Sequence, residues 1–137
     1  MDETISIVLF SGTDDKLTAA ATLAAGAAAL GRPVKIFLQY WALDAFRADR
    51  IKADHGLAPE AGEAGKAAVD AAAKAGQAHW LETLQMAKEL GDVDIQACSA
   101  SMDILKIKHA DLDPIVDGVA GVAAFYVNAG EGQIIFI

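Results

Sequence analysis

Four short stretches of the chain contain β-branched, leucine or phenylalanine side chains at close spacing. They span residues 5–10, 34–39, 93–98 and 133–137, and glycine-containing turns adjoin the first and the last of them. Stretches of five or six residues with such side chains are typical of buried strands. The pattern therefore predicts at least four strands.

An alanine-rich stretch at residues 17–30 lies between the first two predicted strands. Alanine is the strongest helix former, Asp14 and Asp15 are placed to cap the start, and Gly31 followed by Pro33 ends the helix. A strand–helix–strand unit of about 35 residues joins parallel strands.

More helices are predicted between the second and third strands. Tyr40 and Trp41 lead into a short helix that ends near residue 50, and residues 63–75 form an exposed alanine-rich helix. The helix at residues 80–90 has an apolar stripe. The stripe consists of Trp80, Leu81, Leu84, Ala87 and Leu90.

Two segments follow the third strand. Residues 99–107 predict a short helix, and residues 118–129 predict a short strand and then a helix. Together the elements predict a single-domain α/β fold over residues 1–137. It is a three-layer sandwich with a mostly parallel sheet of four to five strands and helices on both faces.

The composition narrows the classes of function. A hydrophobic fraction of 54% predicts an ordered domain, and a net charge of −8 disfavours nucleic acid and anionic membranes as partners. No apolar stretch reaches the roughly 20 residues of a membrane span, and the N-terminus lacks the basic region of a secretory signal. We therefore expect a cytoplasmic protein.

Ligands of an open α/β sheet bind beyond the carboxyl ends of its strands. Gly12, Thr13 and Lys16 follow the first strand. The Lys16 ammonium is suited to an anion or a thiolate, and the alternative, which position alone favours, is a solvated lysine in the first turn of a helix. Tyr40 and Trp41 follow the second strand and are suited to a pocket wall, a subunit interface or packing on a helix. Residues 11–16 lack the glycine pattern of nucleotide-binding loops, which disfavours a nucleotide enzyme.

Cys98 ends the third strand and precedes a predicted helix, whose start Ser99 or Ser101 would cap and whose first turn includes Met102. A helix N-terminus favours the reactive thiolate. The alternative is that Cys98 is a small buried hydrophobic residue with no chemical role. The position of Cys98 in the sequence alone favours this alternative, because lone cysteines are commonly structural. The chain's histidines have no metal-ligand spacing, so neither a metal nor a cofactor is predicted. They are His55, His79 and His109.

Several motifs resemble the DsrE/DsrF-like family. They are IVLFSGTDDK at residues 7–16, AAGAAALG at 24–31, VKIF at 34–37 and WAL at 41–43. The sequence ACSASMDIL at residues 97–105 is similar to the cysteine motif of that family, and GVAGVAAF at 118–125 to the segment after it. The resemblance covers nearly the whole chain except an alanine-rich helical insert at about residues 53–78.

The resemblance is to small soluble sulfurtransferases, the sulfur carriers of sulfur-oxidation pathways. It implies a five-stranded parallel sheet, a homo-oligomer with a trimer favoured, and a sulfur-carrying role for Cys98. The expected activity takes sulfane sulfur, or thiosulfate, onto Cys98 as a persulfide or its analogue and relays it to a partner thiol. A TusA-like carrier or a rhodanese is the implied donor or acceptor. The alternative is a non-catalytic oligomeric binding or scaffold module with a structural Cys98.

Overall fold

A five-stranded, all-parallel sheet forms the centre of the computed structural model, which describes residues 3–137. The order of the strands is β4-β3-β2-β1-β5. The strands are β1 (Ile5–Leu9), β2 (Val34–Leu38), β3 (Val93–Cys98), β4 (Gly118–Ala120) and β5 (Gln133–Phe136). The predicted α/β class with a parallel sheet is confirmed.

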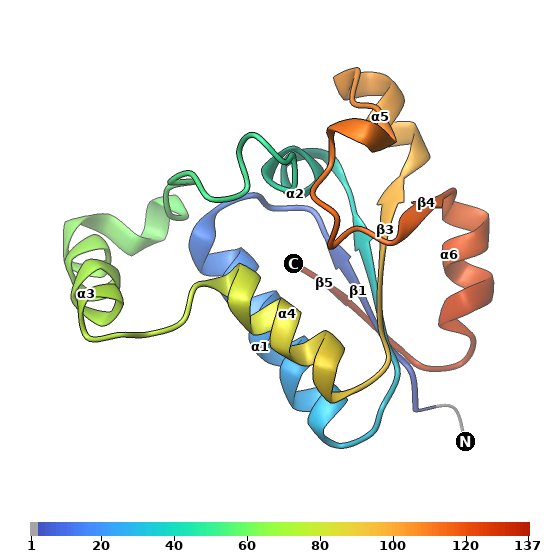
Figure 1. Cartoon of the computed structure of the whole chain (residues 1–137), viewed down its shortest axis with the longest axis horizontal. Helices are drawn as coiled ribbons and strands as arrows, with labels where there is room; N and C mark the ends of the chain where they lie inside the picture. Colours follow the sequence, from blue (N-terminus) through green and yellow to red (C-terminus); the bar gives the residue numbers. More distant parts are fainter. Residues whose placement is uncertain (1–2) are drawn as a thin grey trace.

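Helices cover both faces of the sheet. Helices α1 and α4 lie on one side, which we call the first face, and α6 lies on the other, the second face (Figure 1). The helices are α1 (Asp14–Ala29), α2 (Tyr40–Ala45), α3 (Gly62–Lys74), α4 (Trp80–Leu90), α5 (Ser99–Leu105) and α6 (Val122–Ala129). Two 3-10 turns, η1 (Pro59–Ala61) and η2 (His109–Asp111), complete the elements. None of the helices among residues 3–137 is both long and apolar enough to cross a membrane.

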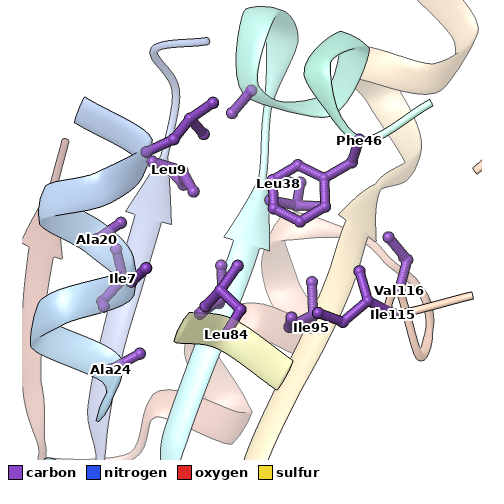
Figure 2. Packing of buried hydrophobic residues seen from close by; sticks show 14 of the residues in the cluster. Ile7, Leu9, Ala20, Ala24, Leu38, Phe46, Leu84, Ile95, Ile115 and Val116 are labelled. Carbon is purple, nitrogen blue, oxygen red and sulfur yellow. The ribbon is translucent and has the colours of Figure 1, made fainter. Parts of the chain in front are cut away.

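The main hydrophobic core lies on the first face. Successive side chains of a strand point to opposite faces, so Ile7, Leu38 and Ile95 of neighbouring strands point together towards the helices (Figure 2). Small side chains on α1, such as Ala20 and Ala24, are fully buried against them. This packing brings α1 close to the sheet and fixes the strands that position the candidate site.

Two carboxylates at the start of α1 anchor a distant loop. Asp14 accepts hydrogen bonds from Trp80 Nε1 at 2.9 Å and from the backbone N–H of His55 at 3.0 Å. Asp15 accepts from the backbone N–H of Ala58 at 3.2 Å. The prediction that these residues cap α1 is wrong: the helix begins at Asp14, and its N-cap, Thr13, makes no side-chain capping bond. The carboxylates instead satisfy donors of His55 and Ala58, before α3, and of Trp80, at the start of α4.

The structure corrects the end of one predicted helix and confirms most of what was predicted for two others. The helix after the second strand ends at Ala45, not near residue 50, because Arg47 turns away and bridges to Leu112. In α4 the apolar stripe is buried apart from Leu90, which is 55% exposed in the last turn. The alanine-rich helix α3 is exposed as predicted and has no buried residue.

Candidate functional site

Cys98 is the last residue of β3, and its side chain is on the second face. It is 4% exposed and shares a small hydrophobic cluster with Phe37 and Phe125, against which Val8 and Ala120 pack. This cluster is separate from the main core on the first face. The thiol therefore has its own apolar enclosure beneath α6.

The strand register explains this enclosure. Val8 lies opposite Phe37 on neighbouring strands, and Cys98 lies opposite Ala120, so all four side chains share the second face. Helix α6 then places Phe125 over them. The Phe37 and Phe125 rings stack with centroids 4.9 Å apart and planes at 18°, so Phe125 covers the floor of the cluster through an aromatic pair.

Helix α5 follows the thiol directly. Cys98 is itself the N-cap residue, with extended φ and ψ of −71° and 117°, and no side chain caps the helix. The prediction that Ser99 or Ser101 caps it is therefore wrong. Ser101 and Met102 are buried, and Met102 belongs to the main core. Ser99 faces Gly121, where an added Cβ would lie 3.7 Å from the serine Oγ.

The loop after β1 is placed at the carboxyl end of the sheet as expected. Gly12 is required there, because an added Cβ would lie 2.3 Å from the carbonyl oxygen of Trp41. Thr13 is the N-cap of α1, and Lys16 is in its first turn, half-buried. Helix α1 covers the first face, whereas the Cys98 side chain lies on the second.

Tyr40 and Trp41 belong to an aromatic row at the carboxyl end of the sheet. The row runs from Phe136 to Phe10, Tyr40 and Trp41, with successive ring centroids 5.7, 5.1 and 5.7 Å apart. Tyr40 has a φ of 41°, a left-handed conformation that costs energy in a residue other than glycine. Trp41 is 56% exposed. The row is thus partly open to solvent.

The sequence prediction missed the two residues that enclose the thiol, Phe37 and Phe125. Alternation along residues 34–39 places Phe37 on the face opposite Ile36, so its place on the second face could be predicted from the sequence. The contact from Phe125 depends on the path of the chain after β4, which no local pattern fixes. Two surface cavities of about 220 and 330 Å³ lie beside Arg47 and Lys52, and Cys98 lines neither.

The fold and this thiol define a class of protein: an all-parallel α/β domain with one cysteine at the carboxyl edge of its sheet. The chain belongs to the DsrE/DsrF/DrsH-like family, which it matches over residues 1–137. It is also 31% identical over 150 residues to the uncharacterized protein YrkE of Bacillus subtilis (strain 168), covering 94% of this chain and 92% of that protein. Membership of this family suggests a role in sulfur relay.

Proposed function

We propose that this protein is a sulfurtransferase that carries sulfane sulfur, or thiosulfate, on Cys98 and relays it to a partner thiol in the cytoplasm. A TusA-like carrier or a rhodanese serves as donor or acceptor. The observation that carries the proposal is the position of Cys98. It ends a strand at the carboxyl edge of the sheet, in an apolar cluster separate from the main core. Membership of the family suggests a role in sulfur relay, with which this proposal agrees.

The chemistry needs only thiol exchange. The Cys98 thiolate attacks the terminal sulfur of a donor persulfide, the donor's S–S bond breaks, and the donor leaves as a thiolate. Cys98 then holds a persulfide, which an acceptor thiolate attacks in the same way. A thiosulfate group on a polythionate would transfer likewise, with thiosulfate as the leaving group. No net oxidation occurs, and no cofactor is required.

The enclosure has a role in this scheme. Phe37 and Phe125 would shield a bound persulfide from stray thiols, which is the task of a carrier between two encounters. Because Cys98 is only 4% exposed, donor and acceptor reach it only when the cover opens. Helix α6 suits that movement, since Gly121 precedes it and Gly130, with a φ of 58°, follows it. Most of its side chains are exposed.

The surface charge suits a protein partner. The chain carries a net charge of −8, so a carrier with a basic patch would be attracted to it. The exposed side chains of α6 include Val122 and Tyr126, at 57% and 61%, which offer apolar contact next to the cover of Cys98. A docked partner could therefore stabilise the open state.

The test is to incubate the reduced protein separately with polysulfide, glutathione persulfide and tetrathionate, and to measure the intact mass. We expect a gain of sulfur, or of a thiosulfate group, that a reductant removes. Cys98 is the chain's only cysteine, so Cys98→Ser is the matched control and should gain nothing. The same adduct on Cys98→Ser would show that another group reacts and would overturn the proposal.

The burial of Cys98 favours one other function, a non-catalytic oligomeric module in which the thiol is a packed hydrophobe. That module predicts no adduct from any small donor. It also predicts none from persulfidated TusA-like or rhodanese partners. Failure with both kinds of donor would place it ahead of the sulfurtransferase.

A further inference from the structure

The part of the chain that covers Cys98 is held to the rest of the protein at few points. It consists of β4 and α6, and we call residues 118–129 the cover segment. Only Phe125 and Ala129 in this segment are buried, and β4 itself is partly exposed. Strand β4 nevertheless brings Ala120 opposite Cys98. Whatever fixes β4 therefore also decides how firmly the thiol is covered.

Asp117 attaches the amino end of β4 to β3. Its backbone N–H donates to the Ile95 carbonyl at 2.7 Å, and its Oδ2 accepts the Ile95 N–H at 2.8 Å. The pairing of β3 with β4 begins only at the next residue, where Gln96 lies opposite Gly118. The carboxylate thus satisfies a backbone donor of β3 beyond the end of that pairing.

The same carboxylate also bonds to a helix on the first face. Lys88 Nζ of α4 lies 2.5 Å from Asp117 Oδ2, and the two side chains are 24% and 37% exposed. An ion pair with that exposure contributes little, because water screens it. A backbone N–H of the fully buried Ile95 that loses its acceptor costs more. The bond to Ile95 is therefore the main contribution of Asp117.

We propose that Asp117 is a positioning residue for the sulfur chemistry of Cys98 and acts through the cover segment. Asp117 holds the amino end of β4, Phe125 holds α6, and the thiol is covered only when both are in place. Asp117 precedes Ala120, the register partner of Cys98, so it acts on the position of the strand and not on the sulfur. This inference rests on the proposed sulfurtransferase function.

Loss of the carboxylate should both expose the thiol and shorten the life of a persulfide on it. Without Asp117 Oδ2, the Ile95 N–H stays buried without an acceptor unless β4 moves to admit water. Such a movement displaces Ala120 and the start of α6 together. A small thiol then reaches sulfur held on Cys98 at a rate that the intact cover suppresses.

The experiment measures two rates on Cys98 under native conditions. The first is the labelling of the reduced thiol with maleimide. The second is the loss of a loaded persulfide to excess glutathione, followed by intact mass. Glutathione takes the outer sulfur as glutathione persulfide and leaves Cys98 as a thiolate.

Three variants separate the bonds that Asp117 makes. Asp117→Ala should speed both reactions about 5–20-fold, the effect of one lost hydrogen bond to a partly exposed charged group. Asp117→Asn keeps an oxygen that can accept the Ile95 N–H and should restore most of the wild-type protection. Lys88→Met removes only the ion pair and should change either rate by less than about 5-fold.

Asp113→Ala is the matched control. Asp113 lies in the same connection before β4, and its Oδ1 accepts the Ile115 N–H at 2.9 Å, so this variant also loses a bond from a carboxylate to the backbone. Its stability in urea should fall comparably, yet both rates should stay at the wild-type value. Equal acceleration in Asp113→Ala and Asp117→Ala, or wild-type rates in Asp117→Ala, would overturn the proposal.

The two rates also distinguish this inference from the proposed function. Labelling requires only a thiol, so it tests the position of the cover whether or not Cys98 carries sulfur. If the wild type accepts no sulfur while Asp117→Ala is labelled faster, the sulfurtransferase proposal fails and Asp117 still positions the cover. If the wild type holds a persulfide and labelling of Asp117→Ala is unchanged, the carrier function stands and this inference fails.

Discussion

Replacing Phe125 by leucine should make Cys98 react faster with a thiol reagent. Phe125 is 6% exposed and stacks on Phe37 at 4.9 Å. The smaller side chain loses part of the buried apolar area and the aromatic pair, together about 1–2 kcal/mol. If the thiol is reached when α6 lifts, the free energy of that opening falls by the same amount. The labelling rate should then rise about 5–30-fold.

Phe46→Leu is the matched control for this measurement. Phe46 is fully buried and contacts the Trp80 ring at 5.2 Å, but it lies in the main core on the first face. The chemical change and its global cost are similar, yet α6 is untouched. Labelling of Cys98 with excess reagent under native conditions should therefore stay at the wild-type rate in this variant. Equal acceleration in both variants would mean that the thiol is exposed by global unfolding, and no change in either would refute a cover formed by Phe125.

Other consequences of the structure concern stability. Gly12→Ala should lower the free energy of unfolding in urea by about 1–3 kcal/mol, since its Cβ would overlap the Trp41 carbonyl; unchanged stability would contradict that close approach. Asp14→Ala leaves the Trp80 indole N–H without its acceptor and should cost about 1–3 kcal/mol by the same measurement, with Asp14→Asn closer to wild type. Burial alone would raise the pKa of Asp15, but hydrogen bonds from Thr13, Ala58 and Lys16 hold it below 3.8. The folded-state pKa of Asp15 is thus depressed, and its ionised form stabilises the fold. Above pH 3.8 the urea midpoint of the wild type should therefore exceed that of Asp15→Asn, and the difference should vanish as the pH falls further below that value. A difference that stays constant with pH would count against this role.

Much of the fold follows from local pattern. The strand ending at Cys98 was predicted with its observed bounds, because a β-rich run followed by serine residues marks where a parallel strand ends. The five-stranded sheet also follows from the resemblance to the DsrE/DsrF-like family. The family match over the whole chain agrees with it.

The remaining details depend on contacts distant in sequence. Asp14 and Asp15 look like caps because acidic residues favour a helix start, but their carboxylates bond to residues more than 40 positions away. Ser99 fails as a cap because Cys98 itself occupies the N-cap position. The cover formed by Phe125 cannot be predicted without knowing that the last helix returns over the second face. That return is set by the tertiary fold.

The most direct test of the sulfur-carrier function follows sulfur from one chain to another. Cys98 is first loaded with a persulfide, excess donor is removed, and the protein is mixed with a reduced TusA-like acceptor while the masses of both chains are recorded. The proposed function predicts that one sulfur atom leaves this chain and appears on the acceptor, and that Cys98→Ser passes none. Sulfur that stays on Cys98, or an acceptor that gains sulfur equally from Cys98→Ser, would contradict it.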